Sequence, residues 1–327
     1  MENIVPSPEH YLNPVVLFAN AIGDHVIFTP TIRALAKMFP GRITLVALPN
    51  VVSTFFAEIS FRNVIELKSK TTTLSNWNLG TQPGDIQNFD VEILEPLLQE
   101  MDLFISPNYW FSTPIENLIK AISPCAVIGI RPELQINVFQ QNIHSFDQYF
   151  CIPQYLNPGL EIDEFSYPIK IEKESFGKIN SFRKTLGNDK KILIVHTDTK
   201  KRKRASPEIF LDVVDRFLSL REDYVAVIVG LGHEMELNKA QNRYRLYDLC
   251  GCTLSETFAI IEKSSLFLGV DSCMLHVADL LRKPGIGFFG PTDPVQWGFK
   301  FSTHYHVNLN DPLDAGLIVT LLQELSK

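Results

Sequence analysis

Polar residues suited to anion binding or acid–base chemistry follow two apolar runs near the carboxyl terminus. The first run, 266–270, is followed by Asp271 and Ser272, with His276 four residues further on. The second run, 285–289, leads into a Gly-Pro-Thr-Asp-Pro loop at 290–294. The runs are typical of buried strands, and 274–281 is typical of a short helix between them. Because helix N-termini at the carboxyl ends of parallel strands present N–H groups, we expect an anion to bind here.

Each of these features also has a purely structural interpretation. Asp271 or Ser272 could simply cap the helix, and the loop at 290–294 could be only a turn. For either feature alone the structural interpretation would be preferred. Their combination with His276, one turn into the helix, favours a binding site.

A carboxylate near the amino terminus is the candidate for general-base chemistry. Asp24 follows the apolar run 14–18 and a tight turn expected at Gly23, and it precedes a segment with apolar residues at helical spacing. A carboxylate at such a strand-to-helix turn could take the proton of an attacking hydroxyl group. Its ordinary pKa of about 4 is low for a base, so partial burial would have to raise it. The alternative is that Asp24 only caps the helix.

Five consecutive basic residues, 200–204, stand out in a chain that is acidic as a whole. One interpretation is a solvated or nucleic-acid-binding run. The other places these residues after a strand, at the mouth of a cleft and against a diphosphate. We expect at least two of the residues at 200–203 to be merely solvated.

The pattern D-S-x-x-x-H-x-A, followed by a strand and F-G-P-T-x-P, resembles the C-terminal signature of glycosyltransferase family 9. These enzymes are the ADP-heptose lipopolysaccharide heptosyltransferases and their relatives. The family usually has glycine where this chain has Cys273. Its N-terminal motif of a glycine, an aspartate, apolar residues and Thr-Pro is similar to residues 23–30. The resemblance implies that Asp24 is the general base.

The resemblance assigns phosphate binding to the segment after the strand expected at 190–196. Thr197 and Thr199 match threonines that contact phosphate in relatives. The family carries a lysine two residues before Trp-Pro; Arg204 occupies the lysine position here, and Ser206 replaces the tryptophan. Since arginine offers phosphate a fork of parallel donors, we expect Arg204 to stabilise the leaving diphosphate.

The contacts to nucleoside and sugar are implied by the same resemblance. Glu234 would hold the ribose, although a glutamate in the first turn of a helix is also expected on dipole grounds. Asp271 matches an aspartate that contacts sugar hydroxyls, and His276 would orient a phosphate or Asp271 unless it is a core histidine. The remaining members of the predicted site are a base pocket at Gly251 and Cys252, backbone N–H groups of Ser272, Cys273 and Met274 for the diphosphate, and a cleft loop of Gly23, Gly290, Thr292 and Asp293.

The alternation of apolar runs and helical patterns predicts an α/β protein of GT-B architecture, with two Rossmann-like, doubly wound domains facing each other across a cleft. We place an acceptor-binding domain at 1–168 and a nucleotide-sugar-binding domain at 169–327, and the last helix, 314–326, could return to the first domain. A further helix is predicted at 233–243. Two stretches, 69–90 and 131–168, interrupt the alternation and are read either as acceptor-binding loops or as irregular surface.

Composition narrows the function classes. The 327 residues suit two domains, and the net charge of −7 gives no reason to expect nucleic acid as a partner. No apolar run reaches the ~18 residues of a spanning helix, so at most peripheral membrane contact is expected. The amino terminus lacks the features of a signal peptide, which predicts a cytoplasmic protein. The five cysteines are read as free thiols without a metal.

The leading hypothesis is an inverting glycosyltransferase that needs neither a metal nor a cofactor besides its nucleotide sugar. The resemblance implies ADP-heptose as the donor, and the expected acceptor is a hydroxyl group of a glycan, of a lipid-linked molecule or of another molecule. The alternatives are a GT-B relative with another donor or with epimerase activity, and a non-catalytic nucleotide-sugar-binding module. A nicotinamide dehydrogenase is disfavoured because neither half shows G-x-G-x-x-G after its first strand.

Overall fold

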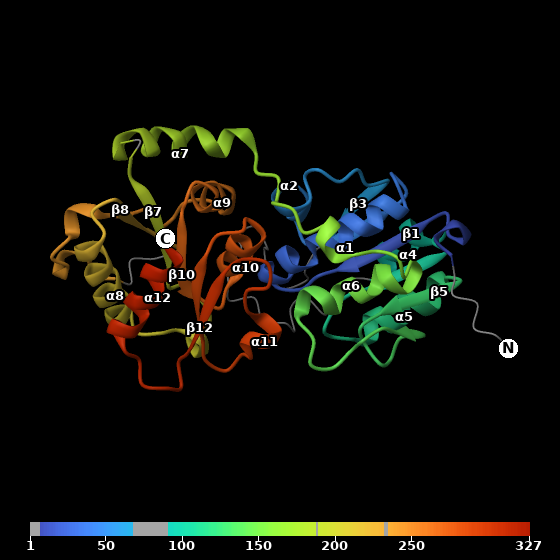
Figure 1. Cartoon of the computed structure of the whole chain (residues 1–327). Coiled ribbons are helices and arrows are strands. Elements are labelled where there is room, and N and C mark those ends of the chain that lie inside the picture. Colours follow the sequence, from blue (N-terminus) through green and yellow to red (C-terminus); the bar gives the residue numbers. More distant parts are fainter. Residues whose placement is uncertain (1–6, 68–90, 188, 232–234) are drawn as a thin grey trace. The chain divides into compact units, whose positions relative to one another are not determined.

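A computed structural model of the chain describes residues 7–67, 91–187, 189–231 and 235–327. The chain divides into two compact units, Met1–Tyr167 and Pro168–Lys327, which run from blue to green and from green to red in Figure 1. The predicted boundary at 168 lies one residue from this division. The roles assigned to the two domains, and the cleft expected between them, stay predictions.

The first unit is built on a six-stranded parallel sheet in the order β3-β2-β1-β4-β5-β6. The strands are β1 Pro14–Phe18, β2 Thr44–Ala47, β3 Asn63–Glu66, β4 Leu103–Ser106, β5 Ala126–Gly129 and β6 Ile136–Asn137. All residues of β1, β2, β4 and β5 are buried, as expected for strands covered by helices on both faces. The strand order reverses direction between β1 and β4, which makes this pair the topological switch point where ligands bind in such sheets.

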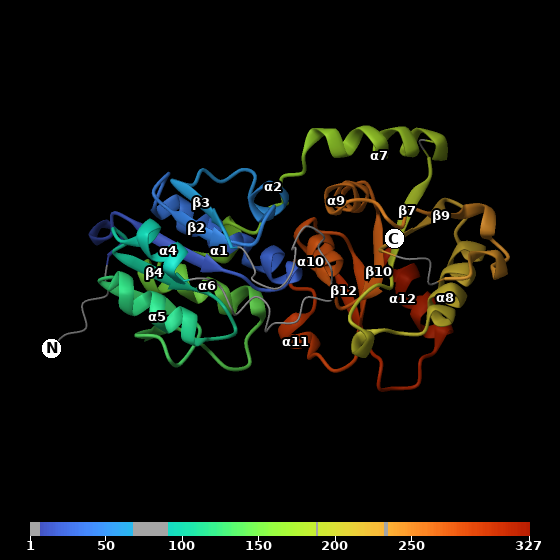
Figure 2. The ribbon, with the colours of Figure 1, turned by 180° about the vertical axis from the view of Figure 1, so that it is seen from behind.

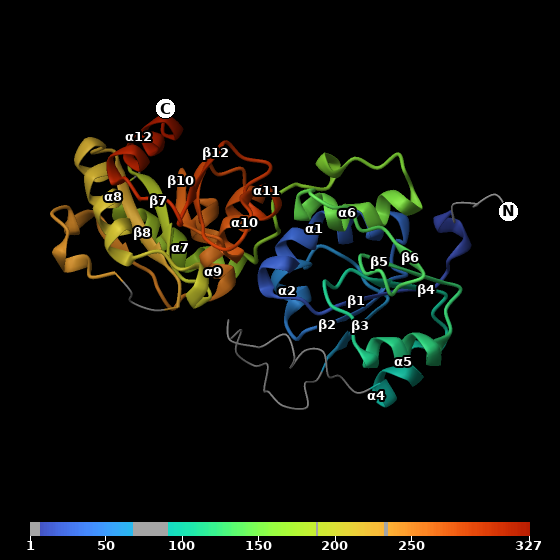
Figure 3. The same ribbon diagram turned by 90° about the horizontal axis from the view of Figure 1, so that it is seen from below.

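Helices cover both faces of this sheet (Figure 3). One pair consists of α1 and α6, which pack together, and a second pair of α4 and α5 covers the opposite face. The helices are α1 Ile22–Met38, α2 Val51–Phe55, α4 Val91–Leu98, α5 Thr113–Ile122 and α6 Ser145–Leu156, with 3₁₀ turns at Pro8–His10 and Ile162–Glu164. Helix α1 runs without interruption through Pro30.

The second unit repeats the plan with a parallel sheet in the order β12-β11-β10-β7-β8-β9, seen from behind in Figure 2. The strands are β7 Lys191–His196, β8 Tyr224–Val229, β9 Leu246–Asp248, β10 Leu266–Val270, β11 Gly285–Phe289 and β12 His304–Asn308. The switch point lies here between β7 and β10. The two sheets therefore have the same doubly wound topology.

The helices of the second unit again form two layers. Helices α8 and α12 pack together on one face, and α7 and α9 pack together with α10 beside them on the other. They are α7 Lys173–Leu186, α8 Pro207–Leu220, α9 Leu254–Glu262, α10 Cys273–Leu280, α11 Pro294–Trp297 and α12 Ala315–Leu325. Pro207 at the first position of α8 fits the preference of proline for a site whose N–H would be unpaired anyway.

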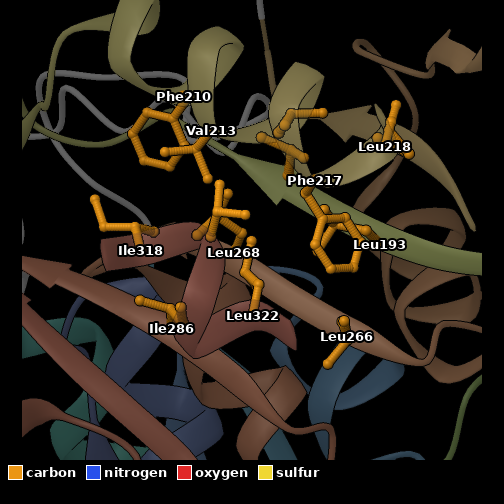
Figure 4. Packing of buried hydrophobic residues seen from close by; sticks show 14 of the residues in the cluster. Leu193, Phe210, Val213, Phe217, Leu218, Leu266, Leu268, Ile286, Ile318 and Leu322 are labelled. Atoms are coloured by element: carbon orange, nitrogen blue, oxygen red, sulfur yellow. The ribbon is translucent and has the colours of Figure 1, made fainter. Parts of the chain in front are cut away.

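A hydrophobic core of the second unit lies between the sheet and the α8–α12 layer (Figure 4). Phe210 and Phe217 of α8 pack with Leu322 of α12 over strand residues such as Leu193 and Leu268, and all five side chains are fully buried. Alternate residues of β7 and β10 point into this core because successive side chains of a strand face opposite sides of the sheet.

The position of α12 differs from the expectation that the last helix returns to the first domain. Ile318, Val319 and Leu322 belong to the core of the second unit, and α12 contacts α8 and β11. The apolar stripe of the helix is therefore buried locally, against α8 and β11.

Two other expectations need correction, and one lies outside the described residues. The stretch 131–168 is not an irregular loop, since it contains β6, α6 and a 3₁₀ turn. The helix predicted at 233–243 is wrong in its described part, which holds two 3₁₀ turns, Leu237–Lys239 and Arg243–Arg245. There the carboxylate of Asp215 accepts hydrogen bonds from the backbone N–H groups of Gln241 and Asn242, which replaces helical pairing. The stretch 69–90 lies outside the described residues.

Candidate active site

The carboxyl ends of β7 and β10, at the switch point of the second sheet, bring two predicted site residues together. Asp271 directly follows β10, and Thr199 follows β7. The Thr199 hydroxyl donates a 2.9 Å hydrogen bond to the backbone carbonyl of Asp271. The backbone N–H of Asp271 donates in turn to the Phe288 carbonyl of β11 at 3.0 Å. These bonds join three neighbouring strand ends into one rigid edge.

The carboxylate of Asp271 is the centre of this edge. Its Oδ2 accepts from the Lys203 ammonium at 2.5 Å and from the Thr292 hydroxyl at 2.6 Å. The Asp271 side chain is only 3% exposed and that of Lys203 is 18% exposed. Burying a carboxylate to this degree is costly unless a cationic partner pairs with it, and Lys203 is that partner. Thr292, which was predicted as part of a cleft loop, therefore belongs to the same group of residues as Asp271 and Thr199.

The basic run at 200–204 is divided by its structure. A 3₁₀ turn at Lys201–Lys203 turns Lys203 inward to Asp271 and leaves Lys200, Lys201 and Arg202 exposed. The expectation that at least two of these residues are solvated is therefore confirmed. Lys203 is a member of the site that the sequence analysis did not predict. Within a run of five basic residues, nothing in the sequence distinguishes it from its neighbours.

Arg204 is anchored next to Thr199. Its Nε donates a 2.9 Å hydrogen bond to the Thr199 carbonyl, although the residue as a whole is exposed. The guanidinium therefore lies beside the Asp271 edge, in the part of the chain from which the sequence predicted a contact to diphosphate. Thr197, predicted for the same role, is buried just after β7.

His196, the last residue of β7, is a second residue that the sequence did not single out. Its Nδ1 lies 3.1 Å from the Ser272 hydroxyl, so a hydrogen bond joins the ends of β7 and β10. Burial lowers the pKa of His196 to about 4, against the opposing effect of the Asp198 carboxylate. The ring is therefore neutral at pH 7 and can act as donor and acceptor at once.

Helix α10 begins immediately after this pair. Ser272 is its N-cap residue, but the hydroxyl makes no capping hydrogen bond to the helix and meets His196 instead. Cys273, Met274 and His276 are buried in the helix. The first turn of any α-helix carries N–H groups that the helix itself does not use, and here they lie at the strand edge that Asp271 occupies.

The residues predicted for the base pocket lie just after β9. Gly251 has a φ of +82°, which suits glycine, and its N–H donates to the Gly230 carbonyl at 2.8 Å. Cys252 lies 3.7 Å from the ammonium of Lys178, which also pairs with Glu256 at 3.3 Å. All five cysteines are free thiols, as expected. Glu234 lies outside the described residues, so its predicted contact to ribose is untested.

Two members of the predicted cleft loop have local structural roles. Asp293 is the N-cap of α11, and its Oδ1 accepts from the Val295 N–H at 2.9 Å. The Gly290 carbonyl accepts from the side-chain amide of Asn310 at 3.3 Å. Thus only Thr292 of this loop reaches Asp271.

In the first unit, Asp24 stands in the first turn of α1, after the switch-point strand β1. Its Oδ2 accepts from the Ala21 N–H at 3.1 Å, which is the acidic half of a capping box. Its Oδ1 lies 3.3 Å from the hydroxyl of Tyr149 on α6. The capping interpretation is therefore correct for one oxygen only. Gly23, the predicted turn residue, lies inside the first turn of α1.

The loop before Asp24 is fixed by a buried amide on the neighbouring strand end. Asn108, which follows β4, accepts from the Ala19 N–H at 2.9 Å and donates to the Leu17 carbonyl at 2.9 Å. This bridge spans the β1–β4 switch point. Next to it, the side-chain amide of Asn20 donates to the Tyr149 hydroxyl at 2.9 Å. Asn108 and Asn20 thus hold the loop that precedes Asp24, and only the strand order brings Asn108 next to it.

His25 adjoins Asp24 on α1 and faces an aromatic core. Its ring lies 4.8 Å from that of Phe18 and 5.5 Å from that of Phe55, measured between centroids. Burial lowers its pKa to about 4 although the Ala21 carbonyl bonds its Nδ1. This environment makes His25 a neutral core residue at physiological pH.

The two doubly wound sheets define the class of the protein as the GT-B type of α/β fold. The model of glycosyltransferase family 9 (heptosyltransferase) matches residues 124–315. The chain belongs to this family. The matched span contains the whole Asp271 edge, whereas Asp24 precedes it.

Individual proteins that are similar to the chain include heptosyltransferases. Lipopolysaccharide heptosyltransferase 1 of Campylobacter coli is 22% identical over 189 residues, which are 54% of this chain and 52% of that protein. The chain thus spans about half the length of that curated relative. A family 9 glycosyl transferase structure from Veillonella parvula has a TM-score of 0.72 at 19% identity, covering 97% of both chains. The ADP-heptose lipopolysaccharide heptosyltransferase II of E. coli has a TM-score of 0.69 at 14% identity, covering 96% of this chain and 98% of that one.

Two further predictions concern a membrane span and the predicted site as a whole. Among the described residues, no helix combines the length and the apolar composition needed to cross a bilayer. The roles predicted for the individual site residues stay predictions. What the structure adds is that Thr199, Asp271, Ser272, Thr292 and Arg204 gather at one sheet edge.

Proposed function

We propose that the chain transfers heptose from ADP-heptose, or a related sugar from its nucleotide, to a hydroxyl group of a glycan or lipid-linked acceptor. The observation that supports it most is the Asp271 edge, because it combines a fixed carboxylate for sugar hydroxyls with cationic and N–H groups for a diphosphate. This edge lies within the span that matches glycosyltransferase family 9.

The proposed reaction is a single displacement. Asp24 takes the proton of the acceptor hydroxyl while the oxygen forms a bond to the anomeric carbon. The bond between that carbon and the donor phosphate oxygen breaks, and the nucleoside diphosphate leaves with the electron pair. Attack from the face opposite the leaving group inverts the configuration of the sugar.

The leaving diphosphate would be stabilised by the protein's own groups. Arg204 and the first-turn N–H groups of α10 supply positive charge and hydrogen-bond donors where negative charge develops. We propose that no metal and no cofactor are needed. Transfer that persists in excess EDTA would agree with this, and transfer restored only by a divalent cation would contradict it.

A donor panel tests the function. ADP-heptose, UDP-N-acetylglucosamine and other nucleotide sugars are incubated with the chain and a set of phosphorylated and unphosphorylated saccharide acceptors. Mass spectrometry should show one glycosylated product with ADP released, and proton coupling constants should show the inverted anomer. Conversion of a donor without any acceptor would indicate an epimerase instead. Binding without turnover over the whole acceptor set would indicate a non-catalytic module.

A further inference from the structure

Three side chains from three elements form a connected line that ends at Asp24. The Asn20 amide, in the loop after β1, donates to the Tyr149 hydroxyl of α6 at 2.9 Å. That hydroxyl lies 3.3 Å from Oδ1 of Asp24 in α1. Tyr149 is fully buried and Asn20 is 5% exposed, whereas Asp24 is half-buried. The line therefore runs from two buried side chains to a half-buried carboxylate.

The direction of the Tyr149 hydrogen follows from the donors around it. A tyrosine hydroxyl has one hydrogen to give, and the Asn20 amide uses one of its acceptor positions. The hydroxyl gives its hydrogen to Oδ1 of Asp24, and Tyr109 is a second side-chain hydrogen-bond neighbour of Tyr149. Burial and, second to it, the Asp24 charge raise the pKa of Tyr149 far above its ordinary value. The hydroxyl thus stays a donor at any working pH.

The ring that carries this hydroxyl is held by aromatic packing. Its centroid lies 5.5 Å from that of Phe28, 5.7 Å from that of Phe18 and 5.2 Å from that of Tyr109. Such a ring has no alternative rotamer in a close-packed core. The distance from hydroxyl to Asp24 is consequently set by the fold and not by a flexible loop.

We propose that Tyr149 is a positioning residue for Asp24, holding Oδ1 by its hydroxyl while the Ala21 N–H holds Oδ2. With both oxygens held, the fold sets the orientation in which the carboxylate meets an acceptor hydroxyl. This inference rests on the proposed function, in which Asp24 is the general base. The 3.3 Å distance is long for an O–H···O bond, so Tyr149 orients the base more than it acidifies it.

The test is the pH dependence of kcat/KM in Tyr149→Phe. Removing a donor from the ionised carboxylate disfavours its charged form, so the acidic limb should move to higher pH by about half a unit to one unit. We expect kcat to fall about 3- to 10-fold at pH 7 while KM for the donor is unchanged. Asn20→Ala should shift the limb in the same direction by less, because the hydroxyl can then rotate.

A matched control is Tyr224→Phe, which removes another buried tyrosine hydroxyl, in the second unit. It should leave the acidic limb in place. A purely structural role of Tyr149 would lower Tm and the active fraction with an unmoved limb, and that result would overturn the proposal. The other titratable neighbours are Tyr109, whose pKa is raised by burial, and His25, whose ring packs on Phe18 and Phe55.

Asp24→Asn separates this inference from the proposed function. If Asp24→Asn keeps full activity, Asp24 is not the base and the proposed mechanism fails. If Asp24→Asn is inactive but Tyr149→Phe has the wild-type pH profile, only the positioning role fails. Loss of activity in Asp24→Asn together with the shifted limb in Tyr149→Phe supports both.

Discussion

The two oxygens of Asp24 have different partners, and this sets what a substitution there should do. Oδ2 accepts from the backbone of its own helix and Oδ1 from Tyr149. Asparagine keeps an oxygen for the Ala21 N–H but has no basic group. We therefore expect Asp24→Asn to fold normally and to bind the donor, while the transfer rate falls at least ~10²-fold. Single-turnover assays measure the rate.

The control for this variant is Glu116→Gln. Glu116 is an exposed acidic residue in the first turn of α5, so it has the same kind of helix position without a link to the site. Its transfer rate should equal that of the unmodified chain. Equal rates in both variants would remove Asp24 from the mechanism.

The basic run offers a matched pair of arginines. Arg204 is anchored at Thr199 beside the Asp271 edge, whereas Arg202 is exposed in the 3₁₀ turn. Since charge-assisted bonds from arginine to phosphate are strong, Arg204→Ala should weaken ADP binding about 10-fold or more in calorimetry. Arg202→Ala should change it less than twofold. Equal affinities in both variants would assign Arg204 to the surface.

At the scale of elements, the assignment of α12 to the second unit can be tested by stability. Leu322 is fully buried against α8 and the sheet, and Leu317 on the same helix is 58% exposed. Leu322→Ala should cost about 2–5 kcal/mol of unfolding free energy, since it leaves a cavity. Leu317→Ala should stay within about 0.5 kcal/mol. Urea denaturation gives both values, and similar small costs would mean that α12 is not part of this core.

The elements show which parts of the structure a sequence pattern can specify. Continuous apolar runs such as 266–270 predicted the strands because strands of a parallel sheet are buried on both faces. The prediction of a helix at 233–243 was wrong because a local pattern contains no information on Asp215. This residue accepts hydrogen bonds from the backbone N–H groups of Gln241 and Asn242, which lie 26 and 27 residues away in the sequence. The aromatic-rich stretch 131–168 was read as loop although α6 lies in it.

The candidate site was predictable to the extent that it is local. Asp24, Asp271 and Thr199 stand next to strand ends, so spacing and resemblance could find them. Lys203 and Tyr149 reach their partners across 68 and 125 residues of sequence, and contacts of that length depend on the strand order. No single-sequence signal distinguishes Lys203 from its exposed neighbours.

At the scale of the whole molecule, two buried histidines with lowered pKa values, His25 in the first unit and His196 in the second, make stability depend on pH. His25 and His196 have pKa values lowered to about 4 by burial, against about 6.5 in an unfolded chain. Below pH 6.5 the unfolded state therefore binds more protons than the native state. The stability contribution is complete above about pH 6.5 and is lost as pH falls toward 4, by up to about 3 kcal/mol for each histidine.

Urea denaturation at pH 7.5 and pH 5 measures this loss. The double variant His25→Gln/His196→Gln has no imidazole to protonate at either site, so its stability should fall less between the two pH values. An equal fall in the variant and the unmodified chain would assign the acid sensitivity to other groups.

The pair of Lys203 and Asp271 has a consequence for how an anion approaches the second sheet. With Lys203 attached, Asp271 presents a dipole instead of a net negative charge, so a diphosphate meets the cation of Arg204 without an opposing repulsion. Lys203→Met would expose that repulsion. The affinity of the variant for ADP should then be lower than that of the unmodified chain. Added salt should reduce this difference in affinity, because counterions screen a repulsion as effectively as an attraction. The presence of Lys203 would therefore determine whether added salt weakens or strengthens nucleotide binding.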